Sequence, residues 1–303
     1  MIAPFPWFGG KSRVQSLVWQ RLGDVPHYVE PFAGSLAVLL GRPTAPQIET
    51  VNDLDGLICN FWRAVKADAA AVAQWADWPV SEPDLHARHL WLLGQLPTLA
   101  DRLCADSAWF DAQIAGWWVW GICSWIGSGW CSCDGPWQAL DGVLVKGDAG
   151  QGITRQLPHL GNAGQGIFDE LSVRLRNVRV CQGDWQRVCG PSVTHKRGLT
   201  GVFLDPPYAD TASRTADLYR TDSDSVAHAV RRWAIENGDN PLMRIALCGY
   251  EGEHVMPATW ECVAWKAQGG YGGQTLSGEN HNANRERIWF SPHCLAGRQG
   301  ALL

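Results

Sequence analysis

Short apolar runs alternate with amphipathic stretches along the first 66 residues. Apolar positions at helical spacing predict helices over 12–22, 35–40 and 57–66. Runs rich in β-branched and aromatic residues predict strands over 27–30 and 48–52. This alternation is typical of one half of a nucleotide-binding sheet.

The same alternation returns toward the C-terminus. Strands are predicted over 177–182, 201–204, 243–248 and 287–291, and a helix over 223–237. The two halves together predict an α/β fold with a Rossmann-like, mainly parallel sheet. Ligands of such sheets bind at the carboxyl ends of the strands.

Between residues 67 and 166 the pattern changes to helical segments that are dense in tryptophan. Ten of the 18 Trp residues lie between Trp75 and Trp137, enough for a small aromatic core of their own. We therefore expect a mainly helical insertion over 67–166, and one domain formed by 1–66 together with 167–303. The uncharged stretch 114–133 is long enough for a membrane span, but glycines interrupt it, so a buried helix and turn is expected.

The end of the insertion, from 141 to 166, is rich in glycine and contains the sequence AGQGI twice. Two copies do not make a solenoid. We expect a loop here, with Arg155, His159 and Asn162 as its polar contact residues.

The overall charge excludes a protein that coats nucleic acid, because 25 basic residues face 30 acidic ones and the net charge is −5. Any contact with nucleic acid needs a local basic face. One candidate is the stretch 172–198, although a solvated surface explains it equally well. Its basic residues are Arg174, Arg176, Arg179, Arg187, Lys196 and Arg197.

The ten cysteines do not form the framework of a small disulfide scaffold, so a reducing cytoplasm is expected. Cys123, Cys131 and Cys133 are the only tight group, and buried free thiols explain them better than zinc does. We assign no metal.

The sharpest chemical signal is the sequence DPPY at Asp205, Pro206, Pro207 and Tyr208, directly after an apolar strand. Consecutive prolines cannot extend a sheet and stiffen the chain where a ligand would lie. The carboxylate of Asp205 and the carbonyl of Pro206 can then accept hydrogen bonds from one planar amino group, while Tyr208 stacks on the ring that bears it. Such acceptors favour a localised lone pair on a poorly nucleophilic amine, which helps most in the transition state.

A second signal is the turn from Glu30 through Pro31, Phe32 and Gly34 to Ser35, between a predicted strand and a helix. Glycine permits close approach of a ligand, and the helix that follows presents free amide groups. Asp53 ends the next predicted strand, at the spacing of an acid that binds ribose hydroxyls. The GxGxxG pattern is missing, so a single nucleoside fits better than a dinucleotide.

Two weaker elements complete the set. Trp7, Gly10 and Lys11 belong to WFGGK, in which the glycines can fold over a ligand and the lysine can meet the carboxylate of an amino-acid cofactor. Asp184 and Trp185 follow a strand and are placed to hold an adenine ring.

These elements, in this order, resemble the Dam-type adenine-specific DNA methyltransferases. The match covers WFGGK, EPFAGS, ND with NFWRAVK at 60–66, GDW and DPPY. The resemblance implies a Rossmann-like methyltransferase fold, S-adenosylmethionine as methyl donor, and an inserted target-recognition region in the cytoplasm of a bacterial or phage-infected cell. The elements before DPPY would line the cofactor site, and Asp205, Pro206, Pro207 and Tyr208 would hold a flipped adenine.

The insertion departs from the recognition hairpin of the GATC-methylating enzymes, so no target sequence is carried over. Three alternatives stay open. The enzyme could methylate another planar amine, in cytosine of DNA, an RNA base or a protein amide; the chain could be a catalytically idle DNA-binding module; or the Trp-rich insertion could be an oligomerisation surface.

Overall fold

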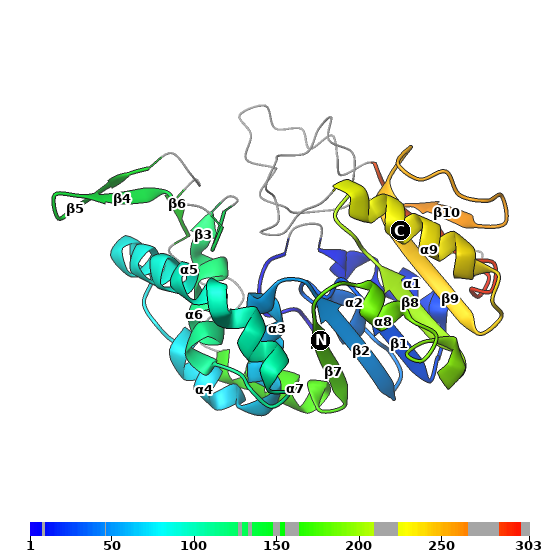
Figure 1. Ribbon diagram of the computed structural model, residues 1–303, viewed down its shortest axis with the longest axis horizontal. Coiled ribbons are helices and arrows are strands. Elements are labelled where there is room, and N and C mark those ends of the chain that lie inside the picture. Colours follow the sequence, from blue (N-terminus) through cyan, green and yellow to red (C-terminus); the bar gives the residue numbers. More distant parts are fainter. Residues whose placement is uncertain are drawn as a thin grey trace.

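A seven-stranded sheet forms the centre of the computed structural model (Figure 1). Its strand order is β10-β11-β9-β8-β1-β2-β7. The structure describes residues 1–7, 10–45, 47–126, 129–132, 135–147, 152–154, 164–208, 224–265 and 285–297. Statements about structure below refer to these residues.

Five neighbouring strands run parallel, as the alternation of elements predicts. They are β1 (His27–Glu30), β2 (Ile48–Asp53), β7 (Val178–Gln182), β8 (Thr200–Leu204) and β9 (Met243–Tyr250). The antiparallel strand β11 (Glu286–Phe290) follows β9, and β10 (Glu261–Ala264) forms the edge. The sequence analysis missed β10, because this short edge strand buries almost no side chain and so carries no hydrophobic pattern.

The direction of the strand order reverses at β1. The chain passes from β1 outward to β2 and β7, and then returns to place β8 on the other side of β1. The carboxyl ends of β7, β2, β1 and β8 therefore meet at one edge of the sheet. A crevice at such a reversal is the usual ligand site of an open α/β sheet.

Alternate residues of the central strands enter two different hydrophobic cores. On β8, Val202 and Leu204 pack on one face, whereas Phe203 packs on the other. Tyr28 and Val29 of β1 divide in the same way. Helices thus cover both faces of the sheet, which explains why a central strand such as β8 is buried along its whole length.

Helices α1, α2, α3 and α7 contribute to the larger core, and α8 and α9 to the smaller one. Their bounds are α1 Gln15–Leu22, α2 Ala37–Leu40, α3 Gly56–Ala67, α7 Gly164–Leu175, α8 Gln186–Cys189 and α9 Asp224–Gly238, with short 3-10 turns η1 at Lys11–Arg13 and η3 at His195–Arg197. The side chain of Asp55 caps α3 by accepting from the amide of Leu57, which fixes where that helix begins.

Three helices follow α3: α4 (Ala69–Ala76), α5 (Glu82–Ala105) and α6 (Ala112–Ser124). The expectation that their tryptophans build a separate core is wrong. Trp118 of α6 contacts Phe5 and Phe61, with ring centroids 4.9 and 5.4 Å apart, and these rings belong to the larger core. The aromatic residues of α6 therefore extend the core that covers the sheet.

Residues 141–166, expected as a loop, are partly ordered in strands and a helix. β4 (Trp137–Leu140) pairs with β5 (Val143–Lys146) in a hairpin that projects from the rest of the molecule, and β3 (Trp125–Ile126) pairs with β6 (Gly152–Ile153) (Figure 1). Two residues with positive φ, Asp141 and Gly142, make the turn of the projecting hairpin. Arg155, His159 and Asn162 lie outside the described residues.

The uncharged stretch forms the buried helix α6, as expected. No helix in the described ranges combines the length and apolar character that crossing a membrane requires. Cys123 and Cys131 are buried, and Cys133 lies outside the described residues.

Candidate active site

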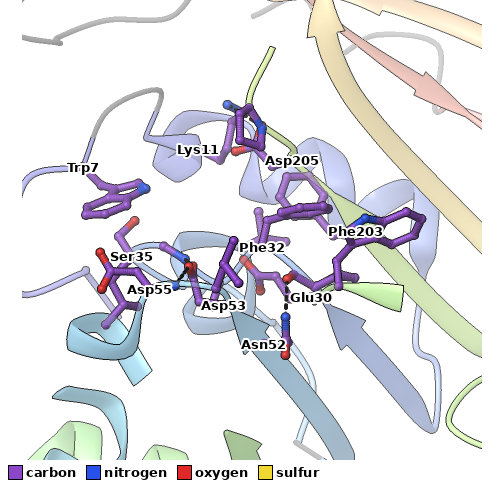
Figure 2. A pocket seen from close by; sticks show the side chains of 18 of the residues that line it. Trp7, Lys11, Glu30, Phe32, Ser35, Asn52, Asp53, Asp55, Phe203 and Asp205 are labelled. Atoms are coloured by element: carbon purple, nitrogen blue, oxygen red, sulfur yellow. Dashed lines mark hydrogen bonds and ion pairs between the residues drawn. The ribbon is translucent and has the colours of Figure 1, made fainter. Parts of the chain in front are cut away.

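One cavity opens at the carboxyl ends of β1, β2, β7 and β8 (Figure 2). All of the side chains that the sequence analysis assigned to a cofactor line it. They are Trp7, Gly10, Lys11, Glu30, Pro31, Phe32, Gly34, Ser35, Asp53, Asp184 and Trp185. Their placement agrees with the expectation, and the role of each in binding stays a prediction.

The turn after β1 brings Gly34 against the indole ring of Trp7. Gly34 has a φ of +44°, and a Cβ atom at this position would lie 2.5 Å from Nε1 of Trp7. The carbonyl of Gly34 accepts from Nε1 of Trp62 at 3.0 Å. Only glycine fits here without displacing an aromatic ring, so the turn and the N-terminal segment form one wall of the cavity.

Asp53, at the end of β2, is held by two backbone amides. Its Oδ2 atom accepts from Gly34 at 3.0 Å and its Oδ1 atom accepts from Asp55 at 2.9 Å. Burial raises the pKa of Asp53 to about 6, although the backbone amides act in the opposite direction. The fixed carboxylate is therefore preorganised to accept hydrogen bonds from a ligand in the cavity.

Glu30, at the end of β1, is almost completely buried and accepts from the hydroxyl of Tyr28 at 2.9 Å. Burial raises the pKa of Glu30 to about 8, and the charge of Asp205 adds to the effect. At neutral pH the carboxyl is mostly protonated, and a cation entering the cavity would favour its ionised form.

Phe32 and Trp185 stand side by side in the cavity, with ring centroids 6.1 Å apart and planes at 31°. Asp184 beside them is exposed, and its Oδ1 atom accepts from the amide of Gln186 at 2.9 Å. Two aromatic faces next to a carboxyl group suit a planar ring that carries an amine.

Lys11 and Asp205 meet across the cavity from Asp53 (Figure 2). The ammonium of Lys11 lies 3.0 Å from Oδ1 of Asp205, and both residues line the cavity. The sequence analysis expected Lys11 to meet the carboxylate of a cofactor, but in the structure it pairs with the first residue of DPPY. The pairing holds one oxygen of Asp205 in place.

Tyr208 does not line the cavity. Its ring is buried and packs edge to face on Tyr250, with centroids 4.6 Å apart. Its hydroxyl lies 3.1 Å from Oδ1 of Asp205 and 2.9 Å from Oε2 of Glu286. The expected stacking of Tyr208 on a substrate ring is therefore not the arrangement seen here. Pro207 lines the cavity and Pro206 does not.

The basic residues of the stretch 172–198 do not all lie beside the cavity. Arg174 forms a bidentate ion pair with the buried Glu49: its Nη1 atom lies 2.6 Å from Oε2 and its Nη2 atom lies 2.9 Å from Oε1. Lys196 and Arg197 are exposed, but they precede the first residue of β8 and so lie at the amino-terminal edge of the sheet, opposite the cavity. Their expected role in holding DNA at the active site is not supported.

Several residues of the site escaped the sequence analysis. Asp55 lines the cavity, and its place two residues after Asp53, just before an apolar helix, was a readable signal. Glu286 begins the last strand, where nothing nearby in the sequence connects it with DPPY. Phe203 lines the cavity from β8 because alternate residues of a strand face opposite sides.

The fold is mixed α/β with a mainly parallel sheet. The cavity has the acidic residues Glu30 and Asp53 at the ends of β1 and β2, and Asp205 of DPPY at the end of β8. Both are consistent with a methyltransferase. Residues 7–81 match the family model of the D12 class N6 adenine-specific DNA methyltransferases. This match confirms the resemblance over residues 7–81 and indicates an adenine-specific DNA methyltransferase. The matched segment includes the Gly34 turn and Asp53 and ends before DPPY. A search of curated proteins finds no match.

Proposed function

We propose that the enzyme transfers the methyl group of S-adenosylmethionine to the exocyclic amino group of adenine in DNA. The observation that carries the proposal is that Asp53, at the end of β2, and Asp205, at the end of β8, line one cavity on either side of β1. Two strand spacings separate β2 from β8, roughly 10 Å, which leaves room for a donor and an acceptor to meet between them.

The residues at the β1 and β2 ends fit such a cofactor. The carboxylate of Asp53 can accept hydrogen bonds from a ribose diol, and such charge-assisted bonds are typically worth about 1.5 to 3 kcal/mol each. Phe32 and Trp185 can enclose the adenine ring, with Asp184 as a polar neighbour. When bound, this cofactor supplies a methyl group that is already electrophilic because the sulfonium is positively charged.

Asp205 is the residue proposed to hold the target amine. Its Oδ1 atom is occupied by Lys11 and Tyr208, whereas Oδ2 makes no hydrogen bond to any described residue. Oδ2 would accept from one amine hydrogen and help to direct the lone pair at the methyl group. The carbonyl of Pro206, expected as the second acceptor, is not part of the cavity lining. After the new C–N bond forms and the S–C bond breaks, Oδ2 can take the proton that the amine loses.

The target base must leave the helix to reach this cavity, at a cost of a few kcal/mol for unstacking. We propose that residues 1–66 and 167–303 form the catalytic domain, and that the insertion 67–166 contacts the DNA. The β4–β5 hairpin supports this, because it projects from the molecule and carries the exposed apolar side chains of Leu140 and Val143 at its tip. Arg155, His159 and Asn162 stay candidates for the same role.

Mass spectrometry of nucleosides tests the proposal. Purified enzyme is incubated with S-adenosylmethionine and, in separate reactions, with unmethylated DNA, RNA and protein. N6-methyl-2′-deoxyadenosine is expected from the DNA reaction alone, and it should be lost with Asp205→Ala. Methyl groups found only on cytosine, RNA or protein would instead support another planar amine, and cofactor binding without any transfer would support an idle module.

A further inference from the structure

The hydroxyl of Tyr208 connects two carboxyl groups that belong to different strands. Asp205 follows β8, and Glu286 begins β11, on the far side of β9. The Tyr208 oxygen lies 3.1 Å from Oδ1 of Asp205 and 2.9 Å from Oε2 of Glu286. Glu286 is only 4% exposed and Tyr208 8%, so water competes little for these contacts.

A phenol has one proton, and it cannot donate to two carboxylates at once. If both acids were ionised, one of the two short oxygen contacts would have no proton in it and would be repulsive. The contact becomes a hydrogen bond when one carboxyl carries its own proton and donates it to the Tyr208 oxygen. The arrangement therefore needs at least one neutral carboxyl group.

The surroundings decide which carboxyl is neutral. Asp205 lies against the ammonium of Lys11 at 3.0 Å, so its carboxyl group has a cationic partner. No basic group of the described residues forms an ion pair with Glu286. Burial raises the pKa of Glu286 most strongly, and the charges of Asp205 and Glu253 act in the same direction. The ammonium of Lys11 and the contact with the Tyr208 hydroxyl act in the opposite direction.

Charged and titratable groups from each neighbouring element lie close enough to affect the pKa of Glu286. Lys11 comes from η1, Asp205 from the end of β8, Tyr250 from β9 and Glu253 from the turn after it. Cys248 of β9 also faces the pair, and burial raises the pKa of its thiol, so it stays neutral. Burial is the largest of these influences on the pKa of Glu286.

We propose that Glu286, in its protonated form, is a positioning residue for methyl transfer. Its carboxyl group donates to the Tyr208 oxygen, and the Tyr208 hydroxyl donates to Oδ1 of Asp205. Together with Lys11 this fixes Oδ1 and turns Oδ2 toward the target amine. The inference rests on the proposed function of Asp205 and adds Glu286, which touches neither substrate nor cofactor.

Glu286→Gln and Glu286→Ala test this relay. The amide of Gln can donate to the Tyr208 oxygen as the protonated acid does, so kcat should stay within about threefold of the wild type. Ala removes the donor, and kcat should fall about tenfold with little change in the dissociation constant of the cofactor. Tyr208→Phe should lose a similar factor, and adding Glu286→Ala to it should cost little more, because both changes break the same chain of bonds.

The pH profile separates positioning from a merely structural role. In the wild type, kcat should fall as pH rises and Glu286 ionises, and Glu286→Gln should remove this fall. Glu251→Gln is the matched control, because Glu251 is an exposed acid that pairs with Arg287 outside the relay, and it should leave the profile unchanged. Equal losses of kcat in Glu286→Gln and Glu286→Ala would overturn the proposal. Identical pH profiles of kcat for the wild type and Glu286→Gln would overturn it as well.

A stability measurement keeps this test independent of the catalytic proposal. A carboxyl whose pKa is raised by folding contributes its stability at low pH and loses it as pH rises from the ordinary value of 4.5 toward the folded value. Urea unfolding should show the advantage of Glu286→Gln over the wild type increasing with pH. An absent pH trend would contradict the relay even in an active enzyme, whereas a trend without DNA methylation would overturn the proposed function alone.

Discussion

The ammonium of Lys11 lies 3.0 Å from Oδ1 of Asp205, although the two residues come from opposite sides of the insertion. Lys11 is also 5.3 Å from the ring centre of Tyr208. The N-terminal segment thus supports the acid of DPPY directly. This contact links the half of the cavity proposed for the cofactor to the half proposed for the target amine.

Asp205→Ala should abolish methyl transfer and leave most of the cofactor affinity, because Asp205 is proposed to act on the amine. A loss of roughly 10² to 10³ in kcat is the usual effect of removing a group aimed at the transition state. Asp53→Ala should instead weaken cofactor binding first. Calorimetry with the cofactor and transfer of labelled methyl groups to DNA measure the two effects, and the opposite pattern would mean that the two sites are exchanged.

Cofactor binding should release protons from Glu30. The pKa of Glu30 is about 8, so the carboxyl is mostly protonated at pH 7. A positively charged ligand nearby stabilises the carboxylate and lowers this pKa. Calorimetry at pH 7 in buffers of different ionisation enthalpy should show release of up to about one proton. Glu30→Gln should remove the release; undiminished release from that variant would place the proton elsewhere.

The raised pKa of Glu30 also makes the stability of the free enzyme depend on pH. Because folding raises this pKa from 4.5 to about 8, the protonated carboxyl favours the folded state, and the benefit is lost as pH rises between these values. The melting temperature of the wild type should therefore fall over this range more than that of Glu30→Gln. Parallel curves for the two proteins would contradict the assignment.

Gly34→Ala should weaken cofactor binding and destabilise the fold. The new methyl group would lie 2.5 Å from Nε1 of Trp7 and displace that ring from the cavity wall. Overpacking of this kind typically costs about 1 to 3 kcal/mol. Gly142→Ala is the control, because Gly142 also has a positive φ, +76°, but has nothing within 4 Å of the added atom. If Gly34→Ala and Gly142→Ala changed the melting temperature and the cofactor affinity equally, backbone strain alone would be responsible.

Arg174→Met should destabilise the protein without acting through DNA. Glu49 is completely buried and pairs with both Arg174 and Arg42, so removing one partner leaves a poorly compensated charge. Breaking a buried pair typically costs about 3 to 5 kcal/mol. Arg176→Met, at an exposed position, should change the free energy of unfolding by less than about 0.5 kcal/mol. Urea unfolding compares the two variants. A small effect of Arg174→Met on the free energy of unfolding would make Arg174 a candidate for a surface contact with DNA again.

The sequence predicted those parts of the fold and site that depend on local patterns. Strands β1, β2, β7, β8 and β9 carry apolar runs, and the residues just beyond their carboxyl ends could be read directly as lining residues. Asp53 and Asp205 were found in this way because the geometry of a parallel sheet brings strand ends together.

The parts that escaped prediction depend on contacts between distant segments. Glu286 reaches Asp205 only through the hydroxyl of Tyr208, and no spacing in the chain reveals that. Arg174 looked like a member of a basic patch because sequence does not show Glu49 beneath it. The tryptophans of α6 looked like a separate core because their partners, Phe5 and Phe61, lie in segments read as part of another domain.

The reversal of strand order at β1 also has a consequence for biosynthesis. Asp53, Glu30 and the Gly34 turn leave the ribosome early, but β1 has an open side until β8 is made, after the whole insertion. A nascent chain that stops before residue 200 therefore leaves β1 paired on one side only, with β2, and exposes half of the cavity. Such chains are expected to bind chaperones, and ligand-assisted folding can begin only when the second half of the sheet has emerged.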